Sequence, residues 1–244
     1  MSKDDWDRHW EDYRDAVATS PAQAYRRRLI LAHLDLPSAA APRILDIGSG
    51  LGDFLIDVHA QYPHVPKLGL ESSQTAVDIA TRRCPEVDFL QRDLLADEAE
   101  APGHRGFATH AVCSEVLEHV DDPLRLLTNA RPYLAEGCRL VVTVPGGPRS
   151  AYDRHIGHRR HFTAAELSQL LTQAGFTVEC ATGAGFPFFN LYRLLVISAG
   201  RRLVRTAAGK PGASLRLLAA VFRVLFKLNS AAGIGWQVLA VARK

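Results

Sequence analysis

The stretch from Arg43 to Phe54 constrains the fold more than any other part of the chain. It begins with a short apolar run, residues 44–47, of the kind found in strands that are buried on both faces. The glycine-rich residues 48–52 follow at once, and apolar residues then recur at helical intervals. Glycine tolerates positive φ and allows a ligand to approach the backbone. The stretch therefore predicts a strand, a glycine turn and a helix whose N-terminus can bind an anionic group.

The glycine spacing limits which ligand this turn can hold. The glycines stand at 48, 50 and 52, which gives G-x-G-x-G rather than the dinucleotide pattern G-x-G-x-x-G. Asp46 lies two residues before the first glycine, where a carboxylate would repel a pyrophosphate and attract an ammonium group. These features disfavour NAD and favour S-adenosylmethionine (SAM), which carries an amine, a carboxylate and a sulfonium. An ordinary α/β turn without a ligand is the alternative.

The same stretch resembles motif I of the class I SAM-dependent methyltransferases, which reads D-x-G-x-G-x-G. Later features follow in the order of that family. Glu71 ends a second apolar run and resembles the family's motif II acid, which accepts the ribose hydroxyls. Asp93 follows a third run and resembles the acid that binds the adenine amino group; a turn residue is the alternative. Residues 114–120 read S-E-V-L-E-H-V and resemble the segment after strand four in small-molecule and quinone-type O-methyltransferases.

The resemblance implies a fold, a cofactor and a set of contacts. The fold is a doubly wound, Rossmann-like α/β sheet of seven strands with an antiparallel last strand. The expected parts are an N-terminal helical lid (1–40), a SAM-binding core (41–183), a helical insertion near the acceptor site (184–232) and the last strand (233–244). For the lid, a helical layer packed on the sheet is the alternative. The contacts expected for SAM, and for the product S-adenosylhomocysteine, are Tyr25, Asp46, Gly48, Ser49, Gly50, Gly52, Glu71, Ser72, Asp93, Leu94, Ser114 and Glu115.

A histidine-rich segment points to the acceptor side. Residues 157–163 resemble the G-H-x-R-x-[FY]-[ST] segment that lies over the acceptor pocket in many bacterial methyltransferases of this type. A hydroxyl acceptor benefits from a general base, and an imidazole titrates near neutrality. We therefore expect His158, His119 or His155 as the base, with purely structural roles as the alternative. Histidines at spacing three could also bind a metal ion, but Gly157 and four nearby arginines disfavour one, and no metal ligand is assigned.

The charge is distributed unevenly along the chain. Ten basic residues and no acidic one follow Glu179, so residues 1–179 carry a net charge of −7 within a total of +3. Two helices are expected over 186–205 and 214–228, the second with a basic stripe beside apolar positions. Such a helix can lie on a membrane surface or bind an anionic lipid-like substrate. The alternative is an insertion that packs on the core. Nucleic acid is disfavoured because stacking aromatics do not alternate with the basic residues.

These observations predict a SAM-dependent methyltransferase that acts on a small molecule. O-methylation of a specialised metabolite, a quinone-like or a glycosyl compound is expected, with a lipid-linked or anionic acceptor as a variant. N- or C-methylation, a membrane-docked SAM-binding module without transferase activity and an NAD-dependent enzyme are the alternatives. The scattered cysteines and the acidic N-terminus predict a cytoplasmic protein, with peripheral membrane contact through residues 186–228. The oligomeric state is left open.

Overall fold

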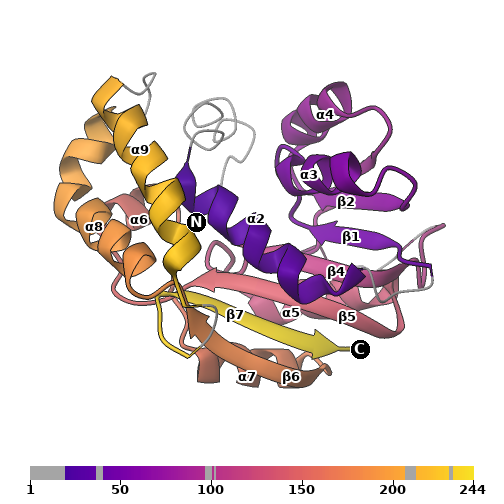
Figure 1. Ribbon diagram of the computed structural model, residues 1–244. Helices are drawn as coiled ribbons and strands as arrows, with labels where there is room; N and C mark the ends of the chain where they lie inside the picture. The colour runs from indigo at the N-terminus through magenta and orange to yellow at the C-terminus, as the bar shows by residue number, and fades with distance from the viewer. Residues whose placement is uncertain (1–19, 37–40, 97–100, 102, 207–212, 231–232) are drawn as a thin grey trace.

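The protein contains a seven-stranded sheet with helices on both faces (Figure 1). The computed structural model describes residues 20–36, 41–96, 101, 103–206, 213–230 and 233–244. The strands are β1 (Ile44–Ile47), β2 (Lys67–Glu71), β3 (Asp88–Gln91), β4 (Ala108–Ser114), β5 (Leu134–Pro145), β6 (Thr177–Ala184) and β7 (Gln237–Arg243). Their order is β3-β2-β1-β4-β5-β7-β6, and β7 runs antiparallel to both of its neighbours. The predicted fold class is confirmed.

Strand β1 lies in the middle of the sheet, and the direction of winding reverses beside it. It pairs in parallel with β2 on one side and with β4 on the other, so that Asp46 is opposite both Gly69 and Val112. All four residues of β1 are buried. Open α/β sheets bind their ligands at the carboxyl ends of the strands where the order reverses. The structure therefore places the glycine turn that follows β1 at such a position.

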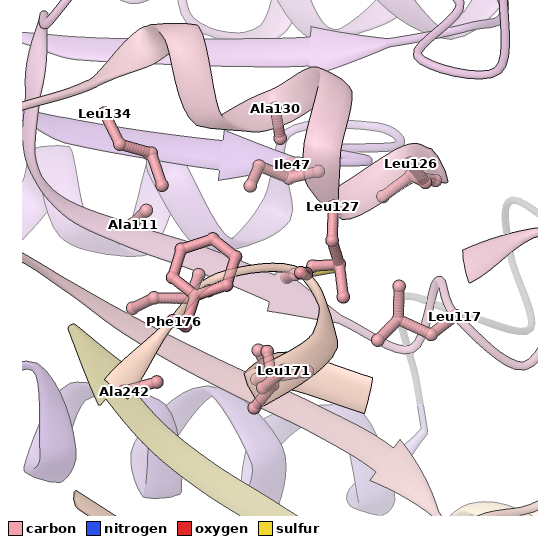
Figure 2. Close-up of a cluster of buried hydrophobic side chains, with 14 of the residues drawn as sticks. Ile47, Ala111, Leu117, Leu126, Leu127, Ala130, Leu134, Leu171, Phe176 and Ala242 are labelled. Atoms are coloured by element: carbon pink, nitrogen blue, oxygen red, sulfur yellow. The ribbon is translucent and has the colours of Figure 1, made fainter. Parts of the chain in front are cut away.

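Two hydrophobic clusters cover the two faces of the sheet. Helices α5 (Pro123–Ala130) and α7 (Ala164–Gln173) bury their leucines against one face, as Figure 2 shows for Leu127 and Leu171 beside Ile47. The other face is covered by α2 (Pro21–Leu34), α3 (Asp53–Gln61) and α4 (Gln74–Arg83). Because strand residues alternate between faces, Leu45 and Ile47 join the first cluster and Ile44 joins the second.

Two predicted helix starts are confirmed and one predicted helix end is wrong. The Ser73 hydroxyl accepts a hydrogen bond at the start of α4, and Thr163 forms a capping box with Glu166 at the start of α7. The sequence predicts a helix over 123–134, closed by a glycine cap at 137, but the helix ends at Ala130 instead. A short 3-10 turn over Arg131–Tyr133 follows, and β5 begins at Leu134. The cause is the proline at 132, which has no backbone N–H to continue the helical hydrogen bonds and whose ring clashes with the preceding turn.

The insertion between β6 and β7 forms the two expected helices, and aromatic residues make up most of its buried side. They are α8 (Phe188–Thr206) and α9 (Ala213–Leu225), the second followed by a 3-10 turn over Phe226–Leu228. The buried aromatic residues are Phe189, Phe222 and Phe226, whose rings pack with Tyr25 and Tyr192. The apolar positions beside the basic stripe, Leu217, Leu218, Val221 and Leu228, are exposed, so the alternative that this side packs on the core does not hold for them. Aromatic rings bury more surface per residue, so they take the core-facing side.

A short helix, α6 (Ala151–His155), follows β5 and was not predicted. It packs against α8, which brings the histidine-rich segment next to the insertion. Within the described ranges, no helix is both long enough and apolar enough to cross a bilayer.

Candidate active site

The residues predicted to contact the cofactor follow four adjacent parallel strands, all at the same edge of the sheet. Asp93 follows β3, Glu71 ends β2, Gly48 follows β1 and Glu115 follows β4. Neighbouring strands lie about 4.8 Å apart, so these four positions span roughly 14 Å. An extended ligand that crosses the strand ends would meet them in that order. This arrangement comes from the topology, because the chain visits the strands in a different order.

Glu71 is held in place by backbone and side-chain donors. Its carboxylate accepts hydrogen bonds from the backbone N–H groups of Gly50 (2.9 Å) and Ser73 (3.0 Å) and from the Ser72 hydroxyl (3.2 Å). Although these bonds favour the ionised form, burial raises the pKa of Glu71 above its ordinary value. Three acceptor positions of about four are used. The carboxylate is therefore fixed in orientation and keeps acceptor capacity for a ligand hydroxyl.

Asp46 and Ser49 place a buried carboxyl group and a buried hydroxyl group beside the glycine turn. Burial, together with the charges of Glu71 and Asp53, raises the pKa of Asp46 to about 7. The hydroxyl of Ser49 is buried and has no hydrogen-bond partner within the described residues. No side chain caps the N-terminus of α3, where Gly52 is the N-cap. A cation near Asp46 and an acceptor near Ser49 would satisfy these groups, so the turn fits an amino acid moiety such as that of SAM.

The glycines of the turn are required by both conformation and space. Gly48 and Gly52 have φ values of 74° and 78°. A Cβ atom at Gly48 would lie 2.5 Å from a methyl group of Val116, and one at Gly52 would lie 2.7 Å from the ring of Phe89. The turn after β1 is therefore packed directly against the loop after β4. Any larger residue would push apart the two loops that border the switch point.

Other predicted contacts take part in local structure. Asp93 is exposed, and its carboxylate accepts a hydrogen bond from the Leu95 backbone at 2.9 Å, as a turn residue does. Leu94 packs at the edge of the first core cluster. The Ser114 hydroxyl is hydrogen-bonded to that of Thr143 at 2.8 Å. The cofactor contacts of these three residues remain predictions.

Glu115 connects three distant parts of the chain. It forms an ion pair with Arg26 of α2 at 2.9 Å and accepts a hydrogen bond from the side chain of Gln237 of β7 at 2.9 Å. Arg26 also donates to the Gln237 side chain at 2.8 Å, which closes a triangle. Glu115 has a φ of 57°, a conformation that residues other than glycine rarely adopt. Such conformations persist where the surroundings enforce them and are frequent at functional sites.

The histidine-rich segment folds against the loop after β4. The rings of His119 and His158 lie 4.6 Å apart, and His158 Nδ1 is 3.1 Å from His161 Nε2. The second nitrogen of His161 is hydrogen-bonded to the Gly147 carbonyl at 2.9 Å. Burial, followed by the charge of His119, lowers the pKa of His158 to about 2, so this ring is neutral at physiological pH. The structure thus brings together His158 and His119, two of the three predicted bases.

The two remaining predicted residues lie elsewhere. His155 is exposed at the end of α6. Tyr25 is buried on α2 among the aromatic rings of the insertion, and its hydroxyl has no hydrogen-bond partner within the described part of the chain. Residues 1–19 of the expected lid lie outside the described residues.

The fold adds three residues that sequence reasoning did not select. Glu118 is completely buried beside the two histidines. Arg193 of α8 forms a bidentate ion pair with Asp153 of α6, with both contacts at 2.9 Å. Although burial opposes it, Arg193 holds the pKa of Asp153 well below its ordinary value. The predicted motif S-E-V-L-E-H-V contained Glu118, but Arg193 and Gln237 carried no local signal, since only tertiary contacts connect them to the site.

Comparison with known proteins identifies the family. Residues 18–181 match the model of a methyltransferase domain, which is about two thirds of the chain. A trans-aconitate 2-methyltransferase of Methylobacterium nodulans is 34% identical over 59% of this chain and 61% of that protein. A ubiquinone biosynthesis O-methyltransferase of Thiobacillus denitrificans is 26% identical over 64% of this chain and 73% of that protein.

Other similarities extend beyond named methyltransferases. An uncharacterised 37.1 kDa transposon protein of Streptomyces fradiae is 31% identical over 68% of this chain and 52% of that protein. The crystal structure of the [4+2]-cyclase SpnF is 20% identical, with a TM-score of 0.63, over 96% of this chain and 93% of that one. The chain spans about half to three fifths of the first curated relatives. On the family model and the shared fold, the chain belongs to the class I SAM-dependent methyltransferases.

Proposed function

We propose that this protein transfers a methyl group from SAM to an oxygen atom of a small-molecule acceptor. The observation that carries the proposal is the spatial order of Asp93, Glu71 and the Gly48 turn along one sheet edge. That order suits the adenine, the ribose and the amino acid moiety of one extended cofactor. The bound cofactor supplies an activated methyl group on its sulfonium.

The chain's own residues would bind and orient. The fixed carboxylate of Glu71 accepts the ribose hydroxyls, and Asp46 attracts the ammonium group. Alignment of the acceptor supplies most of the rate enhancement in a direct displacement. His158 is neutral because burial lowers its pKa to about 2; it is therefore a weak base that would orient an acceptor hydroxyl by a hydrogen bond, and His119 beside it is proposed as the general base. Oxygen is preferred as the acceptor atom because the names of several relatives specify O-methylation.

Cofactor binding is the first measurement. Isothermal calorimetry and thermal shift with SAM, S-adenosylhomocysteine and NAD should give micromolar binding of the first two and none of NAD. Replacement Glu71→Gln should weaken SAM binding at least about tenfold, since a hydrogen bond to a charged group contributes roughly 1.5–3 kcal/mol. Glu86→Gln, which removes an exposed carboxylate before β3 at the opposite end of the strands, serves as the control. A stronger response to NAD would contradict the proposal.

Transfer is tested separately from binding. S-adenosylhomocysteine release is measured with a panel of phenolic, carboxylic and lipid-linked acceptors, together with mass analysis of each product. A mass gain of one methyl group on oxygen is the expected result. SAM binding without any methylated product would favour the alternative of a SAM-binding module without transferase activity. The same fold can carry other functions, since one structural neighbour is named a cyclase.

The exposed face of the insertion supports a lipid-like or anionic acceptor that is reached at a membrane surface. Leu217, Val221, Val224 and Leu228 recur at helical spacing and are 45–69% exposed. Arg216, Arg223 and Lys227 form a neighbouring basic stripe on the same helix. An apolar stripe flanked by basic residues suits the interface of an anionic bilayer. We therefore propose that α9 makes peripheral contact with anionic lipid.

A further inference from the structure

We propose that Glu118, His119 and His158 form a binding site for a divalent transition-metal ion. Both nitrogen ligands approach the same carboxylate oxygen: His119 Nε2 lies 3.9 Å and His158 Nε2 lies 4.0 Å from Glu118 Oε1. The potential ligand atoms of the three residues all lie within 4.8 Å of one another. Glu118 and His119 are adjacent in sequence, whereas His158 is brought to them by the segment after β5.

Glu118 lacks the partner that a buried carboxylate requires. Its side chain is fully buried, and neither oxygen has a hydrogen-bond partner within the described residues. An ionised carboxylate in such a place is costly unless it is paired or coordinates a metal ion. At 3.9–4.0 Å the two imidazole nitrogens are too distant for hydrogen bonds. A cation between the Glu118 carboxylate and the two imidazole nitrogens would therefore balance its charge and satisfy its oxygens.

The hydrogen-bond chain through the histidines fixes which nitrogen of His158 carries a lone pair. The Gly147 carbonyl can only accept, so His161 Nδ1 carries hydrogen and the neutral His161 accepts at Nε2. His158 Nδ1 must then donate to His161, which leaves His158 Nε2 unprotonated. This lone pair faces the oxygens of Glu118. Two acceptors that face each other across 4.0 Å repel unless a cation lies between them, and metal-bound histidines show this outer hydrogen bond.

A second cluster, formed by Asp153, His158 and His161, is less suited to an ion. Both oxygens of Asp153 are occupied by Arg193, and one also accepts from the Ser150 backbone at 2.6 Å. The facing nitrogens of His158 and His161 bond to each other. Asp153 and His161 therefore orient His158 from behind, while Glu118 and His119 complete the coordination in front.

The ligand set indicates the class of ion. Two imidazoles and one carboxylate suit Zn²⁺, Fe²⁺, Mn²⁺ or Co²⁺ and leave coordination positions for water or an acceptor oxygen. Ligands about 2.0–2.2 Å from one ion lie roughly 3.0–3.5 Å apart, so each histidine nitrogen needs to move about 0.4–1 Å closer to Glu118 Oε1 on binding. The proposal does not depend on methyl transfer, because metal binding is measured without SAM or an acceptor.

The test is metal binding by the full chain without an affinity tag that contains histidine. After treatment with EDTA and dialysis, the protein is titrated with Co²⁺ and with Zn²⁺; visible absorption and elemental analysis measure the two ions. One ion per chain and cobalt d–d bands are expected. Glu118→Gln and His158→Ala should weaken binding at least about tenfold. His155→Ala, which replaces an exposed histidine of the same segment, should bind as the wild type does.

Three results would overturn the proposal. The first is a wild-type chain that binds no stoichiometric ion, a result that does not depend on how the variants fold. The second is unchanged affinity in the folded Glu118→Gln and His158→Ala variants, with folding checked by circular dichroism without metal. The third is a result in which the Cys84→Ala variant no longer binds the ion while the Glu118→Gln variant still does. That result would assign the ion to His59, Cys84 and Glu86, another cluster of potential ligands among the described residues.

Discussion

At the scale of single residues, Asp46 shows how a binding group destabilises the protein that carries it. It lies in a buried central strand, where burial and the charges of Glu71 and Asp53 raise its pKa to about 7. The unfolded chain would ionise this group near its ordinary value of about 4. The stability that protonated Asp46 contributes is therefore fully present below pH 4 and is lost as the pH rises through 7. A bound ammonium group would offset this cost.

This conflict gives a prediction with opposite signs for stability and binding. At pH 8 the variant Asp46→Asn should have a higher free energy of unfolding than the wild type, by up to about 4 kcal/mol, and should therefore unfold at a higher temperature. The same variant should bind SAM more weakly. Wild-type affinity should rise about tenfold between pH 6 and pH 8 as Asp46 ionises, and the variant should lose this dependence. Thermal melts and calorimetry across this range measure both effects.

The matched control is Asp88→Asn, which removes an exposed carboxylate on β3. It should change neither the melting temperature nor the pH profile of binding. If Asp46→Asn left the pH profile of SAM affinity intact, Asp46 would not be the group that binds the ammonium.

At the scale of elements, α9 is amphipathic in a way that its packing does not explain. Phe222 and Phe226 bury one side of this helix and the turn after it, while Leu217, Val224 and Leu228 are 62–69% exposed. Arg216 and Lys227 are exposed on the adjacent stripe. A helix that packed only on its own core would have polar residues at the outer positions. The exposed apolar stripe and the adjoining charges are what an interfacial helix presents to anionic lipid.

The prediction for this element is measured by sedimentation with vesicles. Wild-type protein should bind vesicles that contain anionic phospholipid and not neutral ones, and salt should weaken the binding. Leu217→Glu with Val224→Glu should abolish it, and Arg216→Glu with Lys227→Glu should reduce it about tenfold or more, since each basic residue contributes about 1 kcal/mol. Leu124→Glu, an exposed leucine of α5 on the other face of the sheet, should bind normally. Equal binding by all variants would exclude α9 as the contact.

At the scale of the whole molecule, the triangle of Arg26, Glu115 and Gln237 joins the first described helix to the last strand through the loop after β4. Both members of the ion pair have side chains that are only 13% exposed. Nearby, the charge of Glu115 helps to raise the pKa of Glu118, after burial. Removal of Arg26 would leave Glu115 with no ion-pair partner among the described residues and weaken the closure of α2 on the site.

This network predicts different results for two neighbouring arginines of α2. Arg26→Gln should lower the free energy of unfolding by about 3 kcal/mol, because it breaks a mostly buried ion pair. Arg27→Gln should change it by less than about 1 kcal/mol, since the pair of Arg27 with Asp57 is more exposed, with side chains 23% and 45% exposed. Urea denaturation measures both values. Equal effects would mean that the triangle is not a stabilising connection.

Much of the fold follows from local patterns that the sequence carries by itself. The apolar run before the glycine turn, the capping residues Ser73 and Thr163 and the apolar runs that form the strands each specify their element through nearest neighbours along the chain. The cofactor side of the candidate site shares this character. In a parallel sheet the residue after each strand comes to one edge, so Glu71 and Asp93 could be predicted from their positions after apolar runs.

The tertiary structure alone decided the acceptor side and the exposed surface. His158 meets Glu118 and His119 because its segment joins the loop after β4, where the Arg159 N–H donates to the Glu118 carbonyl, a contact that no local pattern specifies. The buried side of α9 could not be predicted, because leucine and phenylalanine are equally apolar in a sequence pattern. Which of them lies inside depends on the space left by Tyr25 and Phe189. Periodicity identifies the apolar positions of a helix, but packing geometry selects which of them are buried.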